Sequence, residues 1–203
     1  MVVRKYRLPV ASVALLALLL QVLYGTAVAL LAWLITALLL WLFRDPPLHA
    51  RSHPMALVSP VRGTVRAAGP GEDPYEADRS GHLVQIDADW RGPYLVRCPI
   101  EGSVVEQWSE WRDPVTRSRH RGRALRIRTD EGDEVLLALA GRVTVDLGRY
   151  FGIGDRVGHA KAIGLMPFGG RAALHFTGHG RILATPGQRV LAGVDPVAEL
   201  IHD

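Results

Sequence analysis

The chain has 203 residues, of which 48% are hydrophobic, and a formal net charge of +4. This length suits one domain with an appendage. Three basic residues lie in the first seven positions and no acidic residue precedes Asp45, so the remainder of the chain is close to neutral. A nucleic-acid-binding protein usually carries a larger basic excess, and we therefore expect no nucleic-acid partner. The single Cys98 excludes an intrachain disulfide framework.

Residues 8–43 contain no Asp, Glu, Lys, Arg or His. A bilayer core of about 30 Å needs roughly 20 apolar residues per helix, so this segment is too long for one span and just long enough for two short ones. With a break at Tyr24-Gly25-Thr26, it predicts a transmembrane helical hairpin with helices at about 8–23 and 27–43, after a basic tip at 1–7. A re-entrant hairpin is an alternative, and so is a cleaved signal peptide, although its apolar core would be shorter.

Basic residues flank the apolar segment on both sides, with Arg4, Lys5 and Arg7 before it and Arg44 and Arg51 after it. Positive flanks favour the cytoplasmic side of a membrane. We therefore expect the protein at the cell inner membrane, with its soluble domain on the cytoplasmic side.

Residues 44–203 are predicted to form an all-β domain, because glycine and proline separate short apolar runs. The alternating segment 123–129 and the run 135–140 flank the turn residues 130–133, which predicts a β-hairpin. The segments Gly154–Val157 and Gly187–Val190 echo each other as Gly-x-x-Val. This repetition favours a lipoyl/biotinyl-like hammerhead, a compact β-sandwich or barrel of short strands.

Arginines crowd one stretch of the β domain. They are Arg112, Arg117, Arg119, Arg121, Arg123, Arg126 and Arg128. With Trp108 and Trp111 nearby, this run is suited to docking on anionic phospholipid headgroups, since indoles prefer the headgroup zone. The alternative is the polar face of a hairpin.

Two histidine pairs are spaced four residues apart, His49 with His53 and His175 with His179. On a helix such a pair could share a metal ion. The first pair falls in a proline-bounded linker and the second in a predicted strand, where residues four apart do not converge in this way. We therefore predict no metal site.

Several short motifs occur in a fixed order along the chain. They are Arg44-Asp45-Pro46, Ser59–Val65, Arg97–Gly102, Ala138–Val143, Gly154–Gly158, Gly164–Arg171 and Gly187–Gly193. In this order they resemble the phosphatidylserine decarboxylase family, in its short bacterial and archaeal form. The resemblance covers nearly the whole chain.

The resemblance implies a self-processing site at Gly169-Gly170. The family has a serine at the position of Gly170, cuts its own chain before that serine and converts the serine into a pyruvoyl cofactor. Self-cleavage needs a side-chain oxygen to attack the preceding carbonyl, and β-elimination then makes the ketone. Glycine has no β-carbon, so neither step is available at the Gly169–Gly170 bond.

Two further family positions are substituted. The aspartate that helps to set up cleavage corresponds to Arg62, and the histidine that serves proton transfer corresponds to Tyr94. We therefore expect no self-cleavage and no pyruvoyl cofactor. The candidate headgroup-binding residues are Arg97, Arg119, Arg121 and Arg171.

Three functions are compatible with these observations. The leading hypothesis is a membrane-anchored pseudoenzyme of phospholipid metabolism, which binds a membrane phospholipid or partners with an active paralogue or with its own copies. The second is an active decarboxylase, converting phosphatidylserine to phosphatidylethanolamine and CO2 through another residue such as Ser103 or Thr177. The third is a hammerhead adaptor or scaffold at a membrane.

Overall fold

The computed structural model describes residues 7–42, 56–76, 79–113, 118–143, 145–147 and 151–201. The chain divides into two compact units, Met1–Pro47 and Leu48–Asp203, which we describe separately. Some sequence features lie outside the described residues: most of the basic tip, the Arg44-Asp45-Pro46 motif, Arg51, the pair His49 and His53, and Arg117.

The first unit is a hairpin of two helices, α1 (Arg7–Tyr24) and α2 (Thr26–Leu42). Gly25, with a φ of +83°, separates them. The Trp33 indole N–H donates to the Gln21 side-chain oxygen at 2.9 Å, which joins the two helices. Small residues such as Ala17 and Ala29 are fully buried, whereas most of the leucines are exposed.

The prediction that this hairpin is transmembrane is wrong. Among the residues that the structure describes, no helix is long and apolar enough to cross a membrane. The helices have 18 and 17 residues. At 1.5 Å per residue they rise about 26 Å, which is less than the roughly 30 Å of a bilayer core. The predicted break at residues 24–26 is nevertheless where the chain turns.

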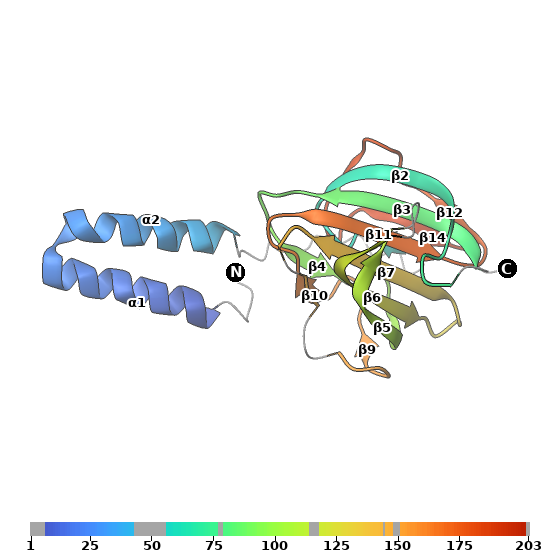
Figure 1. Ribbon diagram of the computed structural model, residues 1–203, viewed down its shortest axis with the longest axis horizontal. Coiled ribbons are helices and arrows are strands. Elements are labelled where there is room, and N and C mark those ends of the chain that lie inside the picture. Colours follow the sequence, from blue (N-terminus) through green and yellow to red (C-terminus); the bar gives the residue numbers. More distant parts are fainter. Residues whose placement is uncertain are drawn as a thin grey trace. The chain divides into compact units, whose positions relative to one another are not determined.

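An antiparallel eight-stranded sheet dominates the second unit (Figure 1). Its order is β13-β2-β3-β11-β7-β6-β5-β9. The strands are β13 (Arg189–Val190), β2 (Gly63–Glu72), β3 (Ser80–Ala88), β11 (Gly170–Phe176), β7 (Glu134–Gly141), β6 (Arg119–Arg128), β5 (Gly102–Arg112) and β9 (Arg156–Val157). The predicted hairpin is confirmed, because β6 pairs with β7 around a tight turn at 129–133.

Two small sheets complete the β domain. One has the order β1-β14-β12 and the other β4-β10-β8. Their strands are β1 (Ala56–Val58), β14 (Pro196–Leu200), β12 (Gly180–Ile182), β4 (Leu95–Arg97), β10 (Ala162–Leu165) and β8 (Asp146–Leu147). The hammerhead prediction is therefore corrected: strands of up to 11 residues build one large curled sheet in place of a sandwich of short strands.

The sequence echo has a structural counterpart at the two edges of the large sheet. At each edge, one valine donates a backbone hydrogen bond to one residue of an echo segment and accepts one from its neighbour. The two valines are Val65, bonded to Gly187 and Gln188, and Val104, bonded to Gly154 and Asp155, all at 2.7–2.9 Å. The strand order also reads symmetrically outward from β11 and β7. The β domain thus has an approximate internal twofold arrangement.

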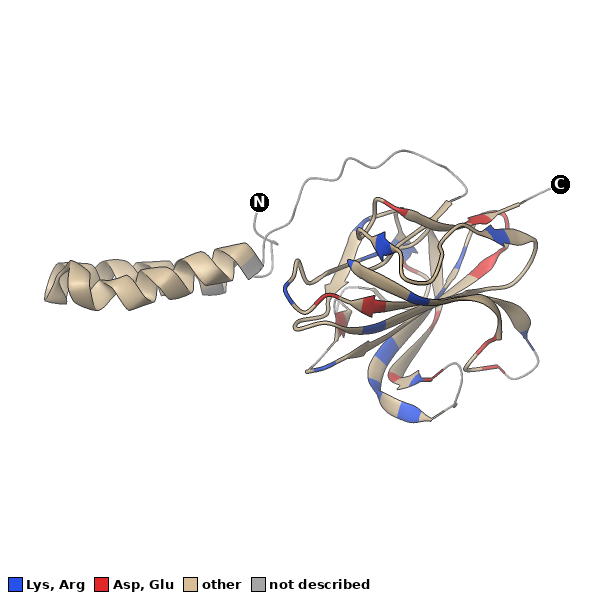
Figure 2. Cartoon of the chain, turned by 90° about the horizontal axis from the view of Figure 1, so that it is seen from above, with Lys and Arg blue, Asp and Glu red and all other residues tan. Residues whose placement is uncertain are grey.

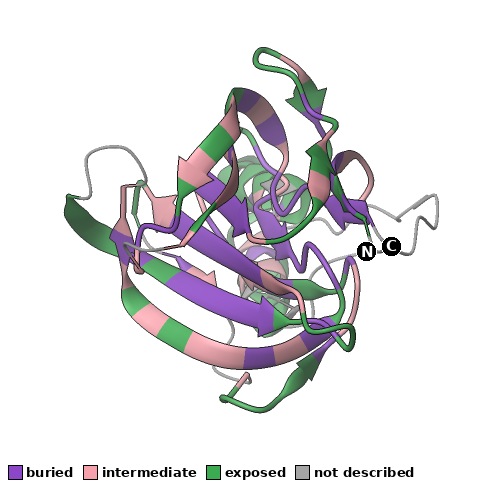
Figure 3. Cartoon of the chain, turned by 90° about the vertical axis from the view of Figure 1, so that its right-hand side faces the viewer, coloured by how far each residue is buried: buried purple, intermediate pink, exposed green. Residues whose placement is uncertain are grey.

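The large sheet has an inner and an outer face, because side chains alternate along a strand. Leu174 and Phe176 of β11 belong to the main hydrophobic core, together with residues of neighbouring strands such as Ile86 and Leu137. Ala173, one position away, belongs to a second, smaller cluster on the outer face, around the buried Trp111. The buried positions along the central strands are visible in Figure 3. Each large buried apolar side chain contributes about 1.5–3 kcal/mol to folding.

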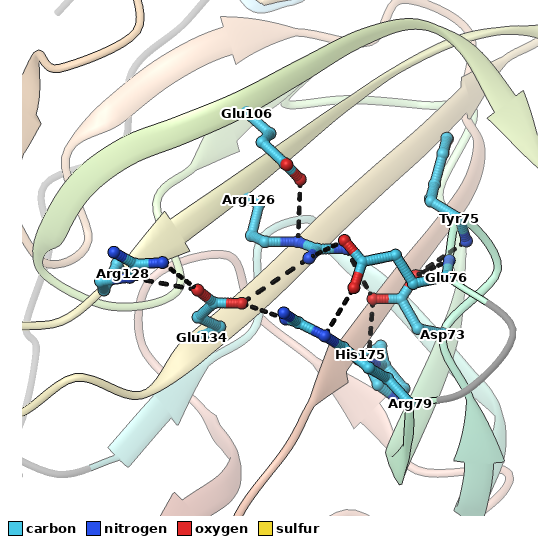
Figure 4. A network of polar contacts seen from close by, with 9 residues as sticks. All are labelled: Asp73, Tyr75, Glu76, Arg79, Glu106, Arg126, Arg128, Glu134 and His175. Carbon is cyan, nitrogen blue, oxygen red and sulfur yellow. Dashed lines mark hydrogen bonds and ion pairs between the residues drawn. The ribbon is translucent and has the colours of Figure 1, made fainter.

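A network of ion pairs lies on the outer face, around the buried Arg126 (Figure 4). This guanidinium donates to Asp73 at 2.9 Å and to Glu76 at 2.5 Å. Glu134 is a further member of the network, 3.6 Å from Arg126, and it accepts hydrogen bonds from Arg79 and Arg128. Burial alone would raise the pKa of Glu134, but these hydrogen bonds hold it below its usual value. A buried charge is tolerated only when it is paired in this way.

His175 adjoins this network from β11. Its side chain is 2% exposed, with Nδ1 3.8 Å from an Asp73 oxygen. Its Nε2 has no hydrogen-bond partner among the described residues. Burial lowers the pKa of His175; the Asp73 carboxylate and a hydrogen bond with the Gly71 backbone oppose this shift, whereas Arg126 and His82 reinforce it. The native protein therefore holds this imidazole in its neutral form.

We predict that His175 makes the protein sensitive to acid. The unfolded chain binds a proton at this histidine near pH 6.5, whereas the folded chain binds it only at lower pH, so stability falls as the pH drops through about 6.5. One proton limits this contribution to the slope to about 1.4 kcal/mol per pH unit. Urea unfolding of His175→Gln between pH 7.5 and 5 should show a shallower dependence than the parent. The exposed His179→Gln is the matched control, and an equal slope in all three proteins would contradict the prediction.

Candidate functional site

A cavity of about 550 Å³ lies at the end of the outer face where β11 begins. It is lined by Arg66, Asp87, Ala88, Trp111, His120, Ala140, Gly141, Arg142, Gly170 and Arg171. These residues come from or adjoin six segments of the large sheet, and three of them are arginines against one aspartate. The lining therefore carries a net positive charge, although Asp113 outside the lining also pairs with Arg171. The charged residues of the β domain are coloured in Figure 2.

Gly170, the position of the family serine, lines this cavity. It is the first residue of β11 and is paired with Ala88 on one side and Gly141 on the other. The preceding carbonyl, which self-cleavage would attack, accepts a hydrogen bond from the Arg142 backbone N–H at 3.1 Å. The carbonyl is thus held by a backbone donor, but residue 170 offers no side-chain nucleophile.

The backbone around Gly170 leaves no room for a side chain. Its φ is +153°, a conformation that residues with a β-carbon rarely adopt. A β-carbon at this position would lie 2.1 Å from the Ala140 carbonyl oxygen and 2.9 Å from the Gly141 Cα. Both contacts are with the backbone of β7 and cannot be relieved by a rotamer change. Position 170 therefore has no serine, and in this backbone conformation a serine side chain would not fit there.

The other two substituted family positions converge on the same place. Arg62 forms an ion pair with Asp89 at 3.2 Å, and its carbonyl accepts from the Asp89 backbone N–H. The Tyr94 hydroxyl donates to the Trp90 carbonyl at 2.8 Å. A β-carbon built on Gly169 would lie within 3.2 Å of residues 88–90, so this segment touches the Gly169–Gly170 bond. The structure therefore brings Arg62, Tyr94 and Gly170 around one short segment.

Tyr94 is suited to structural support rather than proton transfer at neutral pH. Its side chain is 5% exposed, and its ring centroid lies 5.6 Å from that of Phe168. Burial raises the pKa of this phenol above its usual value near 10. It therefore remains protonated where a histidine would titrate.

The four predicted headgroup-binding arginines fall in different environments. Arg171 lines the cavity and lies 3.6 Å from an Asp113 oxygen. Arg97 is buried, and its guanidinium donates to the Ala160 carbonyl at 3.0 Å. Arg119 and Arg121 are exposed on β6, on either side of His120. Since neighbouring residues of a strand point to opposite faces, His120 reaches the cavity and these two arginines do not line it.

The rest of the arginine run is largely neutralised. Arg112 and Arg119 both lie within 3.7 Å of Glu110, while Arg126 and Arg128 belong to the network around Glu134. The polar-hairpin interpretation fits these pairs better than a continuous docking surface does.

Neither alternative nucleophile lies beside the processing position. Ser103 sits within β5, paired with Arg128 and Arg156. Thr177 follows the last residue of β11, at the strand end opposite Gly170. In the described part of the chain, no three His, Cys, Asp or Glu residues gather as a metal ion would need.

The sequence interpretation missed Arg66, Arg142 and His120 as cavity residues. Arg66 directly follows the Ser59–Val65 motif and Arg142 lies inside the Ala138–Val143 motif. Their proximity to these motifs was the available signal. No sequence motif pointed to His120. It lines the cavity because its side chain lies on the outer face of β6, which the sequence alone does not determine.

Comparisons with known proteins support the same kinship. A phosphatidylserine decarboxylase proenzyme of Aromatoleum aromaticum is 27% identical over 184 residues, covering 87% of this chain and 85% of that protein. The proenzyme of Nitrosomonas eutropha is 26% identical over 91% of this chain and 85% of its own length. That of Symbiobacterium thermophilum is 27% identical over 93% of this chain and 89% of its own length. No family model matches the chain. Over most of its length the chain is thus similar to curated phosphatidylserine decarboxylase proenzymes, which supports the family resemblance.

We predict that any side chain at position 170 destabilises the fold. Gly170→Ala should lower the free energy of unfolding by about 2–5 kcal/mol, since it combines backbone strain with a steric clash. Gly132→Ala is the matched control: Gly132 also has a positive φ, of 96°, but no atom lies within 4 Å of its built β-carbon. That variant should lose only about 1 kcal/mol. Denaturant unfolding measures both, and equal losses would contradict the packing argument.

Proposed function

We propose that the protein is a non-processing relative of phosphatidylserine decarboxylase that binds the anionic headgroup of a phospholipid in the cavity beside Gly170. The observation that carries the proposal is the pairing of a cation-lined cavity with a processing position that has no reactive side chain. The relatives' name supplies the class of ligand, a phospholipid with a phosphoserine headgroup. A phosphate group is well matched to arginine, whose planar donors bind it through two hydrogen bonds.

The approximate twofold arrangement sharpens this proposal. In the twofold arrangement β2 corresponds to β5 and β3 to β6. Thr64 of β2 pairs with Asp87, and Ser103 of β5 pairs with Arg128. Asp87 and Arg128 therefore hold equivalent positions. Their partners on the next strand, Arg171 and Glu134, are equivalent too. At the Glu134 end, the charges are closed into a network of ion pairs. At the Arg171 end the equivalent strand positions surround an open cavity, where bound phosphate would supply the missing negative charge.

The cations of the cavity are only partly compensated within the protein. Arg66 and Arg171 each have a carboxylate at 3.6–3.7 Å, longer than a direct hydrogen bond. Arg142 is exposed, and within the described part of the chain its side chain takes part in no ion pair. Such exposed pairs contribute little to stability and rearrange readily around a ligand.

The residues present do not fit a pyruvoyl group. That group occupies the position of a residue with a β-carbon, and the β7 backbone fills this space at Gly170. We therefore derive no decarboxylation step. Placement at the inner membrane and pairing with an active paralogue or a second copy remain predictions.

The intact mass of the purified protein tests the absence of processing. We expect one species of 22.2 kDa, with no fragment beginning near residue 170. Gly170→Ser should also remain uncut, because Arg62 and Tyr94 are unchanged and the serine lacks space. Two chains in the parent protein, the smaller carrying a blocked N-terminus, would overturn the proposal.

Binding of glycerophosphoserine, followed by isothermal titration calorimetry, tests the cavity. Arg171→Ala should weaken binding about 10- to 100-fold, since a hydrogen bond to a charged group contributes about 1.5–3 kcal/mol. Arg181→Ala on β12 is the matched control, as an exposed arginine on another sheet. Equal affinity in the two variants would show that the ligand does not use the cavity.

A further inference from the structure

Three large apolar side chains are exposed around the Gly169–Gly170 bond. They are Trp90, Val143 and Phe168, which are 57%, 56% and 49% exposed. Each comes from a different loop, after β3, after β7 and before β11. We call these three residues the rim. Exposed apolar groups are common singly, but a cluster at a binding site indicates an interaction surface.

Backbone contacts hold the three loops together. The Trp90 backbone nitrogen lies within 3.2 Å of a β-carbon built on Gly169. The Gly169 carbonyl accepts from Arg142, the residue before Val143. Phe168 directly precedes Gly169, and Tyr94 contacts both the Phe168 ring and the Trp90 carbonyl. The backbone segments that carry the rim residues therefore meet at the Gly169–Gly170 bond, beside the cavity.

Cationic side chains accompany the rim. The Arg91 guanidinium lies 4.8 Å from the centre of the Trp90 ring. Arg142 both adjoins Val143 and lines the cavity. Tryptophan is enriched at the membrane–water interface, and each basic residue near an anionic lipid surface contributes favourable binding. The combination of exposed aromatic rings and arginines is complementary to such a surface.

Phe168 provides a separate observation. Its φ is +60°, a conformation that is rare for a bulky residue and carries a cost in backbone strain. Phe168 sits in this conformation with half of its side chain exposed to solvent. Full burial of the ring does not offset this strain within the described structure. Backbone strain that packing does not offset is typical of functional positions.

We propose that the rim docks onto the surface of a bilayer that contains anionic phospholipids, with Trp90, Val143 and Phe168 entering the headgroup zone. The inference rests on the proposed headgroup site. A lipid whose headgroup lies in the cavity keeps its acyl chains in the bilayer, so the cavity has to open at the lipid surface. The rim residues Val143 and Phe168 adjoin Arg142 and Gly169 in the chain, and Arg142 and Gly170 line the cavity, so the rim lies beside the cavity mouth.

Site-specific fluorescence in the full chain tests the docking. Val143→Cys is labelled with the environment-sensitive dye nitrobenzoxadiazole and mixed with phosphatidylcholine vesicles with or without phosphatidylglycerol. The native Cys98 should stay unlabelled, because it is fully buried and burial raises the pKa of its thiol to about 12. We expect a blue shift and a several-fold emission increase with anionic vesicles, reversed by salt and quenched by spin-labelled lipid.

Ile201→Cys is the matched control. Ile201 is 47% exposed and hydrogen-bonds with His179, beyond the opposite end of β11. Its label should not respond. A label at position 143 that stays in water, or an equal response at both positions, would overturn the docking proposal.

Two further variants separate docking from stability. Phe168→Gly removes the ring and relieves the positive φ, so it should reduce the response at position 143 without lowering the melting temperature. Trp90→Ala combined with Arg91→Ala should abolish that response. If these variants respond like the parent, the rim is not the docking surface. Binding of glycerophosphoserine in solution does not need the rim. If this binding persists while vesicle docking fails, the docking proposal is wrong and the proposed headgroup site stands.

Discussion

The site depends on one constraint, the backbone pairing of β11 along its whole length. From Gly170 to Phe176 this strand is paired with β3 on one side and β7 on the other. Its even-numbered residues 172, 174 and 176 fill the main core, which fixes the register. Register then decides where the first residue falls, and it sets Gly170 against the Ala140 carbonyl with no space for a side chain. The absence of a side chain at position 170 is thus tied to the register of a central strand, at the end where that strand begins.

The two ends of β11 show how equivalent strand positions can serve different purposes. Near His175, a buried arginine and its carboxylates close on one another, which avoids the large cost of an unpaired buried charge. At Gly170 the charged side chains remain partly exposed around a cavity. Stability accounts for the first arrangement, whereas the proposed headgroup ligand would account for the excess of cations in the second.

Local patterns predicted what depends on neighbours in the sequence. Alternation and turn residues predicted the β6–β7 hairpin, and the Gly-x-x-Val echo corresponds to equivalent bonds at the two sheet edges. The same patterns could not predict that Arg126 is buried, because its partner Asp73 lies 53 residues away. The transmembrane prediction for the apolar hairpin was also wrong, because a count of apolar residues does not determine where each helix ends. The cavity was missed for a similar reason, because tertiary register brings its residues together.

The three substitutions at the family positions are linked by the contacts that they make. Arg62 holds Asp89 through an ion pair, and Tyr94 holds Trp90 through its hydroxyl. Residues 88–90 in turn press against Gly169, at a distance that a β-carbon would not allow. The side chains of Arg62 and Tyr94 therefore support the segment that packs on the Gly169–Gly170 bond. Restoring serine alone would meet a backbone arranged for glycine, and restoring the other two residues would remove the contacts that hold this segment. Arg62, Tyr94 and Gly170 are therefore parts of one set of contacts around the Gly169–Gly170 bond, and they are better considered together than as three separate substitutions.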